Sequence, residues 1–163
     1  MAFPDRHFVI VDYQYGPDNC PVELAEGEDC YAKVLPNVTS LMFAKDQAGF
    51  LAGVLAGCMT KTNVIGSVAG PEIPPVVAFV TGYQNGARWV NPNVQTLNQF
   101  IPSFEDPERG ELAGREQIAN GADVIFGVGG LTGDGGLVAA HEARRMAIGV
   151  DVDQYYTFPE AAP

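Results

Sequence analysis

The chain has 163 residues, which allows one domain or one domain and part of a second, and it carries a formal net charge of −11 at pH 7. All three lysines lie in the first 61 residues, so no basic surface is available for nucleic-acid phosphates or an anionic membrane, and neither is expected as a partner. No apolar run approaches the ~20 residues of a membrane-spanning helix, and the two histidines form no cluster with cysteines at zinc spacing. We therefore expect no metal site and no cofactor.

The first part of the chain combines two apolar runs with a long polar loop. Residues 8–12 predict a short buried strand, and residues 38–43 predict another strand. Residues 14–37 are rich in turn formers and predict a loop, with an acidic segment between Cys20 and Cys30. A disulfide between these two cysteines fits an exported protein, whereas three unpaired thiols in a cytosolic protein are the alternative.

Residues 45–60 predict a helix with a glycine-rich face for close packing. Gly49, Gly53 and Gly57 recur every four residues, a spacing that would favour helix dimerisation in a membrane. Because the segment is short and begins with charged and polar residues, we expect tight packing on a sheet instead. Cys58, in the same helix, is expected to be a buried thiol.

From residue 64 onward, strands and helices alternate regularly. Strands are predicted at 64–70, 94–101, 122–128 and 147–151, separated by helices at 75–90, 106–120 and 132–145. This alternation is typical of β-α-β units, so the predicted fold class is α/β with a doubly wound parallel sheet. We expect residues 62–154 to form a near-complete carboxyl-terminal lobe with four parallel strands, residues 1–61 to form part of an amino-terminal lobe, and residues 155–163 to form a tail or hinge.

The loops that follow the predicted strands are the candidate ligand site, because open parallel sheets bind ligands beyond the carboxyl ends of their strands. Residues 127–136 are the richest in glycine. Thr132 stands where a dinucleotide-binding fingerprint needs its third glycine, and no Lys-Ser or Lys-Thr pair follows, as a phosphate loop would require. Close approach of the backbone to a neutral ligand, or simply a tight turn between strand and helix, fits this segment better.

Acidic and aromatic residues accompany these strand ends. Asp151 and Asp153 flank one valine, and on an extended strand end they would point to the same side, where Asp151 could accept hydrogen bonds from sugar hydroxyls. The alternative is that the two acids cap the next turn. Aromatic residues such as Phe104 and Phe126 could stack on a flat ring or fill the core. No activated nucleophile or acid–base pair is placed for catalysis, so we do not expect an enzyme.

Several segments occur in an order that resembles a known family. They are 50–56 (Phe-Leu-Ala-Gly-Val-Leu-Ala), 82–87 (Gly-Tyr-Gln-Asn-Gly-Ala), 103–107 (Ser-Phe-Glu-Asp-Pro) and 148–154 (Ile-Gly-Val-Asp-Val-Asp-Gln). With these segments the chain resembles the basic membrane protein family of bacterial ABC-transporter solute-binding lipoproteins. The resemblance implies a type I periplasmic-binding fold with three αβα layers, which holds a purine nucleoside in a cleft between two lobes. It also implies an ABC permease as partner and an extracytoplasmic, lipid-anchored full-length protein.

The resemblance also implies roles for individual residues. Asp151 would bind the ribose hydroxyls, and the Gly129–Gly130 turn would line the same wall. Phe126 is a further candidate ligand residue because of its aromatic ring, and not because of the resemblance. Asp46 and Gln47 are candidates for a polar residue of the cleft, although Gln47 stands where the family usually has glutamate.

Parts of the family pattern are not matched. The amino-terminal part with its lipidated cysteine, the carboxyl-terminal return and a secretion leader are not found, and residues 14–35 have no counterpart. A second hypothesis is therefore a truncated paralogue that serves as a non-transport assembly or regulatory module. In that hypothesis, an unfinished sheet at residues 8–43 would recruit a partner or another copy of the chain.

Overall fold

The structure is a computed structural model that describes residues 3, 5–13, 15, 20–34 and 36–157. It divides into two compact units, Met1–Ala44 and Lys45–Pro163.

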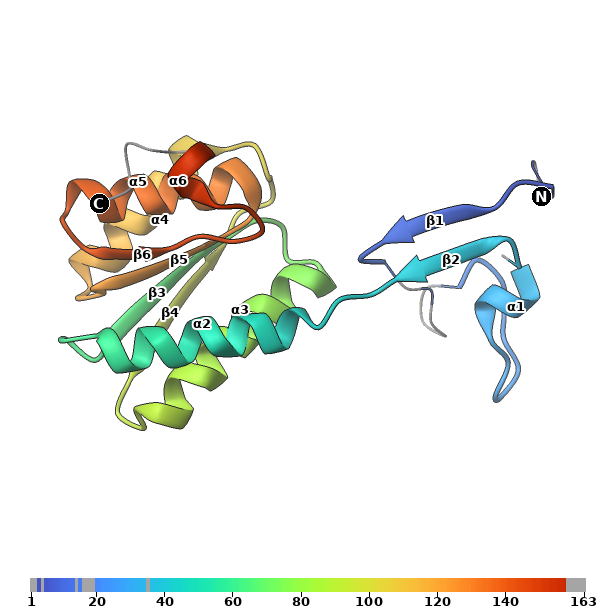
Figure 1. Ribbon diagram of the computed structural model, residues 1–163, viewed down its shortest axis with the longest axis horizontal. Helices are drawn as coiled ribbons and strands as arrows, with labels where there is room; N and C mark the ends of the chain where they lie inside the picture. The colour runs from blue at the N-terminus through green and yellow to red at the C-terminus, as the bar shows by residue number, and fades with distance from the viewer. Residues whose placement is uncertain (1–2, 4, 14, 16–19, 35, 158–163) are drawn as a thin grey trace. The chain divides into compact units, whose positions relative to one another are not determined.

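The smaller unit is built on two parallel strands, β1 (Phe8–Val11) and β2 (Val38–Leu41), at the two apolar runs (Figure 1). Two neighbouring parallel strands need a crossover between them. Here the crossover contains a short helix, α1 (Cys30–Val34), within the segment predicted as a loop. Asp29 starts this helix, because its Oδ1 accepts hydrogen bonds from two backbone amides of the first turn, at 2.7 and 3.3 Å.

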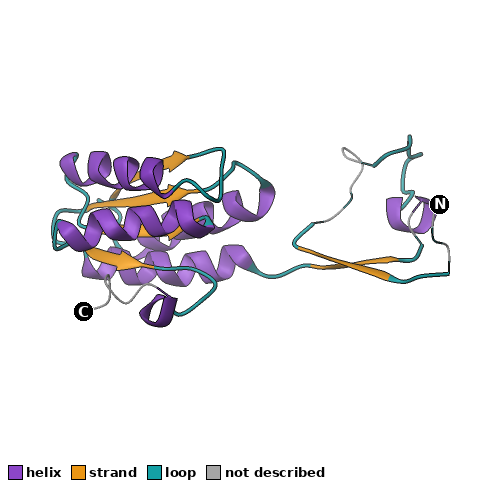
Figure 2. Cartoon of the chain, turned by 90° about the horizontal axis from the view of Figure 1, so that it is seen from above, coloured by secondary structure: helices purple, strands orange, loops and turns teal. Residues whose placement is uncertain are grey.

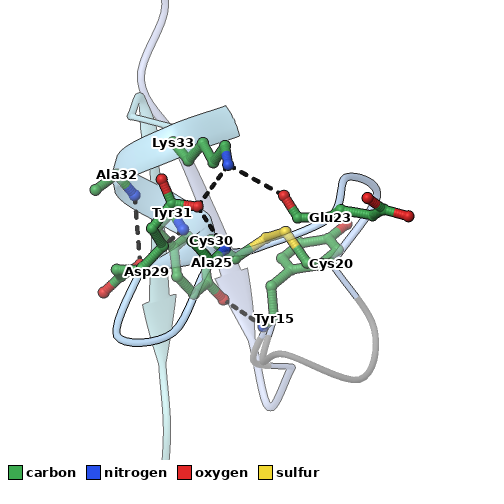
Figure 3. The surroundings of a disulfide bond; sticks show 10 residues. Tyr15, Cys20, Glu23, Ala25, Asp29, Cys30, Tyr31, Ala32 and Lys33 are labelled. Atoms are coloured by element: carbon green, nitrogen blue, oxygen red, sulfur yellow. Dashed lines mark hydrogen bonds and ion pairs between the residues drawn. A yellow bond between two sulfur atoms is a disulfide. The ribbon is translucent and has the colours of Figure 1, made fainter.

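A disulfide joins Cys20 to Cys30, the two cysteines that bracket the acidic segment. Beside it, the hydroxyl of Tyr31 accepts a hydrogen bond from the backbone amide of Tyr15 at 3.0 Å (Figure 3). Lys33 Nζ donates to a backbone carbonyl of the loop, also at 3.0 Å. The acidic segment is therefore attached to α1 by one covalent bond and by the hydrogen bonds of Lys33, whereas Tyr31 holds Tyr15, which precedes the segment.

The larger unit contains the four parallel strands that the sequence predicts, in the spatial order β4-β3-β5-β6. The strands are β3 (Val64–Ala69), β4 (Gln95–Phe100), β5 (Val124–Val128) and β6 (Met146–Ile148). Five helices accompany them in the described part of this unit: α2 (Lys45–Met59), α3 (Pro74–Val90), α4 (Pro107–Ala119), α5 (Gly130–Glu142) and α6 (Gln154–Thr157). Helices α2 and α3 lie on one side of the sheet, and α4 and α5 lie on the other (Figures 1 and 2). The predicted α/β class with three αβα layers is confirmed.

Alternate residues of the central strands face opposite helix layers. In β3, Ile65 and Ala69 belong to the apolar cluster that includes α3, whereas Val68 belongs to the cluster beneath α4 and α5. In β5, the ring of Phe126 packs against that of Tyr83 in α3, with their centroids 4.9 Å apart. Both faces of the sheet are covered, which explains why these strands are apolar almost throughout.

Helix α2 packs along α3 through the backbones of both helices, so its glycine face meets α3, whereas Ala56 of the same helix belongs to the apolar cluster on the sheet. A Cβ atom added to Gly49 would lie 2.3 Å from the carbonyl oxygen of Phe79, and one added to Gly53 would lie 1.9 Å from that of Tyr83. These distances leave no room for a side chain, so the glycines allow the two helices to touch.

This packing places α2 in the larger unit. The compact units divide between Ala44 and Lys45. The sequence suggested a boundary after residue 61 instead, because the sequence does not reveal the contacts of α2 with α3. The expectation of a buried thiol was also wrong: Cys58 is exposed. The glycine face of α2 meets α3, and Cys58 lies outside that face.

Candidate ligand-binding site

The carboxyl edge of the sheet has a switch point between β3 and β5, because the chain goes from β3 to β4 on one side and then to β5 on the other. Gly70, which follows β3, donates its backbone N–H to the carbonyl oxygen of Val128 at 2.7 Å. A Cβ atom on Gly129, whose φ is +151°, would lie only 2.3 Å from the nitrogen of Gly70. The predicted glycine turn therefore brings the ends of two neighbouring strands into backbone contact.

The loop after β4 reaches the same point through Phe104. A Cβ atom on Gly70 would lie 2.9 Å from two carbons of the Phe104 ring, and one on Gly130, whose φ is +56°, would lie 3.1 Å from the carbonyl oxygen of Phe104. The Phe104 side chain is nevertheless 42% exposed. An accessible aromatic ring thus lies beside the glycine turn, a role that the sequence could not separate from core filling.

Thr132 connects these loops and was missed as a site-building residue. Its side chain is fully buried, and its hydroxyl donates to the carbonyl oxygen of Ser103 at 2.8 Å and accepts from the amide of Asp106 at 3.0 Å. Its own amide donates to the carbonyl oxygen of Phe104 at 3.2 Å. In the sequence, the only signal for this role was the presence of one hydroxyl residue among the glycines. From that pattern Thr132 was used only to exclude a dinucleotide-binding fingerprint.

Asp151 lies at this same edge of the sheet. Strands β5 and β6 are parallel and pair Phe126 with Ile148, and Asp151 follows Ile148 by three residues just as Gly129 follows Phe126. Asp151 is exposed and has a φ of +66°, so the chain bends here and is not extended.

The expectation that Asp151 and Asp153 share a strand face was wrong, because β6 ends at Ile148. Asp153 instead caps α6: its Oδ1 accepts a hydrogen bond from the amide of Tyr155 at 3.0 Å. Of the two alternatives considered for these acids, capping holds for Asp153. Asp151 is the acid that remains exposed at the edge.

Phe126, expected as an aromatic contact to the ligand, is a core residue. It is 2% exposed and packs beneath α3 against Tyr83. Its position in the middle of β5 keeps it away from the carboxyl edge. Phe104 is the aromatic side chain that the structure brings to that edge.

Asp46 and Gln47 lie in the first turn of α2 and are exposed. Helix α2 ends at the amino edge of the sheet, where the carboxylate of Asp123, beside the start of β5, accepts a hydrogen bond from Thr60 at 2.6 Å. The first turn of α2 therefore lies at the carboxyl edge. There the two residues line a groove of about 430 Å³ between α2 and α3. The other lining residues are Phe50, Leu51, Thr81, Gly82 and Asn85.

Two further findings concern the described residues as a whole. Within the described ranges, no three side chains of His, Cys, Asp or Glu come together in an arrangement that could hold a metal ion. Among the helices of the described residues, none is both long enough and apolar enough to cross a bilayer.

A parallel, doubly wound sheet with its loops gathered at a switch point is the architecture of type I periplasmic-binding-like proteins, and other α/β classes share it. Solved structures agree with the type I periplasmic-binding class. The chain superimposes on a solute-binding protein of an ABC transporter system from Conexibacter woesei with a TM-score of 0.64 at 27% identity, covering 91% of this chain and 44% of that one. For a solute-binding protein from Aeropyrum pernix K1 the TM-score is 0.73 at 24% identity, covering 97% and 43% of the two chains, which supports the fold alone.

The chain belongs to the family of PnrA-like ABC transporter substrate-binding proteins, whose family model matches residues 1–162. Basic membrane protein D of Borreliella burgdorferi is 33% identical over 151 residues, which are 90% of this chain and 44% of that protein. The ABC transporter nucleoside-binding protein BmpA of Lactococcus lactis is 35% identical over 136 residues, 78% of this chain and 39% of that protein. The chain thus spans less than half the length of these two relatives.

Proposed function

We propose that this chain forms one wall of the ligand cleft of an ABC-importer solute-binding protein, and that the captured solute is a purine nucleoside. The observation that carries the proposal is the convergence of the Phe104 ring, the Gly129–Gly130 turn and the Asp151 region on one edge of a parallel sheet. The name of the Lactococcus lactis relative, a nucleoside-binding protein, supports the choice of solute.

Each of these residues has a chemistry suited to one part of a nucleoside. Phe104 is 42% exposed, and its ring can stack on a purine base. Carboxylate oxygens accept hydrogen bonds from vicinal hydroxyls, which suits Asp151 to the ribose. Gly129 and Gly130 carry no side chain, so the backbone amides at the start of α5 can approach the ligand closely.

Asp46 and Gln47 remain candidates for a polar contact from the first turn of α2. Both are exposed at the carboxyl edge. Their side chains line the groove between α2 and α3, and that lining includes no residue of the strand-end loops. We therefore rank them below Asp151 as ligand residues.

The proposal includes the remaining parts of an import system. A solute-binding protein delivers its ligand to an ABC permease and works outside the cytoplasm, so a permease is the proposed partner and a lipid anchor on the full-length protein is the proposed attachment. The family consists of substrate-binding proteins, which supports capture and not catalysis. No finding favours the alternative of a non-transport module.

Titration of the ¹⁵N-labelled chain with inosine, guanosine and adenosine, followed by amide chemical shifts, tests the site. We expect shifts at the loops that carry Phe104, Gly129 and Asp151. Asp151→Asn should weaken binding by about tenfold or more, because hydrogen bonds to a charged group contribute about 1.5–3 kcal/mol. Binding by the chain alone should be weak, since closure of a cleft over the ligand supplies much of the affinity.

Asp153→Asn is the matched control, because Asp153 caps α6 and is not assigned to the ligand. It should change local stability but leave nucleoside affinity within about twofold, a small fraction of the effect of one charged hydrogen bond. Equal losses in the two variants, or shifts confined to residues outside the strand-end loops, would contradict the assignment of Asp151.

A further inference from the structure

The turn that carries Asp151 has an uncommon backbone conformation. The amide of Val152 donates to the carbonyl oxygen of Val150 at 2.8 Å, and Asp151 between them has a φ of +66°. A three-residue turn with a positive φ at its central residue is rare and strained when that residue carries a side chain. Such a conformation persists only where neighbouring groups hold it, and it is found most often at ligand sites.

The side chain of Gln154 gives the base of this turn a second hydrogen bond. Its Nε2 donates to the carbonyl oxygen of Val150 at 2.9 Å, so this one oxygen accepts from both Gln154 and Val152. The side chain of Val150 is half-buried and packs against the apolar cluster that includes α3. The residue before Asp151 is therefore held twice, by core packing of its side chain and by two donors on its carbonyl oxygen.

Gly149 leaves the space that Gln154 occupies. A Cβ atom on Gly149 would lie 2.0 Å from Oε1 and 2.3 Å from Cδ of Gln154, so the carboxamide lies directly against the glycine. The atoms in the way are the far end of a flexible side chain. A larger residue at position 149 would therefore displace Gln154 and leave the backbone in place.

We infer that Gln154 is the positioning residue for Asp151, an inference that rests on the proposed function. By holding the carbonyl group of Val150, Gln154 fixes the strained turn and with it the direction of the Asp151 side chain. Among the described residues, no hydrogen bond or ion pair occupies the Asp151 carboxylate, which is exposed. A carboxylate that is fixed before the ligand arrives loses little conformational freedom on binding. Gln154 thus contributes to recognition of the ribose hydroxyls, and not to contacts with the base.

A comparison of inosine with 2′,3′-dideoxyinosine, which lacks both ribose hydroxyls, tests this role by NMR titration of the 163-residue chain. The parent chain should prefer inosine by about tenfold or more, the effect of hydrogen bonds to a charged group. Gln154→Met keeps the length of the side chain and removes the donor. It should reduce this preference to about threefold or less and leave the affinity for dideoxyinosine within about twofold. Gln95→Met, at the exposed first position of β4, is the matched control and should keep the parent preference.

Gly149→Ala displaces the same carboxamide from the other side, so it should reduce the preference for inosine in the same way. Without any nucleoside, the Val152 amide should exchange with solvent about fivefold faster in both variants, because its turn is released. This measurement keeps the inference testable if one variant fails to fold.

Two outcomes in the variants would overturn the inference. One is a Gln154→Met chain that keeps the parent preference for inosine. The other is an equal loss of affinity for both nucleosides, which would give Gln154 a general role in stability. Failure of the proposed function is recognised in the parent chain, since a parent that binds both nucleosides equally would remove the ribose role of Asp151 and this inference with it.

Discussion

At the scale of single residues, neighbouring acids of one motif have different tasks because their local hydrogen bonds differ. Asp153 accepts from the amide of Tyr155 and caps α6, whereas Asp151 lies in a left-handed bend and stays exposed. Gln154 stabilises this bend, since its Nε2 donates to the carbonyl oxygen of Val150 at 2.9 Å. The sequence of the motif shows two equivalent acids, and only the backbone conformation distinguishes them.

Asp123 leads to a prediction about pH at the same scale. Burial alone would raise the pKa of Asp123, but hydrogen bonds from Thr60, Lys61 and Thr62, at 2.6, 2.6 and 3.0 Å, outweigh burial and hold its pKa below the usual value. Asp123→Asn should therefore lower the free energy of unfolding at pH 7 by about 1–3 kcal/mol. Because the folded pKa is depressed, this stabilisation is present above the unfolded pKa, near ~4, and is lost as the pH falls through the folded pKa.

Urea denaturation of the parent chain and the variant from pH 7 down to acid pH measures this difference. Asp134→Asn is the matched control, because burial raises the pKa of the Asp134 carboxyl and its charged form is not favoured by folding. That variant should lose no stability at pH 7. An Asp123→Asn penalty that stays constant down to low pH would show that lost packing, and not the carboxylate charge, causes the effect.

At the scale of secondary-structure elements, the pair α2 and α3 shows how small residues decide which elements touch. Glycines of α2 meet backbone atoms of α3, and Gly82 and Gly86 of α3 meet backbone atoms of α2 in return. This reciprocal contact holds α2 in the larger unit. It also leaves the apolar ridge of Leu51, Leu55 and Met59 on the outside.

Gly53→Ala tests this contact by the sign of its effect. In an exposed helix the change from glycine to alanine stabilises by about 1 kcal/mol. Here the new Cβ would lie 1.9 Å from the carbonyl oxygen of Tyr83, so we expect a loss of about 1–3 kcal/mol instead. Thermal and urea unfolding measure this change in stability. Ala48→Gly, at an exposed position of α2, measures the effect of helix propensity alone. A stabilised Gly53→Ala protein would mean that the helices are further apart.

At the scale of the whole molecule, each of the two compact units is stabilised by different interactions within itself. The larger unit has apolar clusters on both faces of a four-stranded sheet. The smaller unit has two strands and the Cys20–Cys30 disulfide, and large apolar side chains such as Val9 and Val11 are exposed in it. A two-stranded sheet is marginal by itself, so the disulfide should matter most there.

Replacing Cys20 and Cys30 by serine should therefore affect the units unequally. A disulfide that closes a loop of this size stabilises by about 2–3 kcal/mol, mainly by restricting the unfolded chain. Hydrogen exchange followed by mass spectrometry should show faster exchange in residues 5–44 and unchanged protection in residues 64–148. Cys58→Ser is the control, because Cys58 is exposed and unpaired. Uniform loss of protection in both units would contradict this division of stability.

The sequence by itself determined the order of the main strands and helices and the family, whereas α1 and α6 lie in segments that were predicted as a loop and a tail. Apolar runs separated by helical patterns are local signals, and right-handed parallel crossovers follow from them by general rules, so the four parallel strands and the αβα layers could be predicted. The edge that carries the glycine turn and Asp151 could be predicted for the same reason, because parallel strands end on one side. The sequence left open whether Cys20 and Cys30 are paired, and the structure shows the disulfide between them.

Only the tertiary structure decided which side chains reach that edge and which elements pack together. Phe126 and Phe104 are both aromatic residues near strand ends, but burial beneath α3 removes one from the site and leaves the other exposed. Thr132 acts through contacts with residues 103–106, which no local pattern encodes. The glycine spacing of α2 predicted close packing, but these glycines meet α3 and not the sheet. Long-range contacts are set by the fold as a whole and not by the residue spacing within one helix.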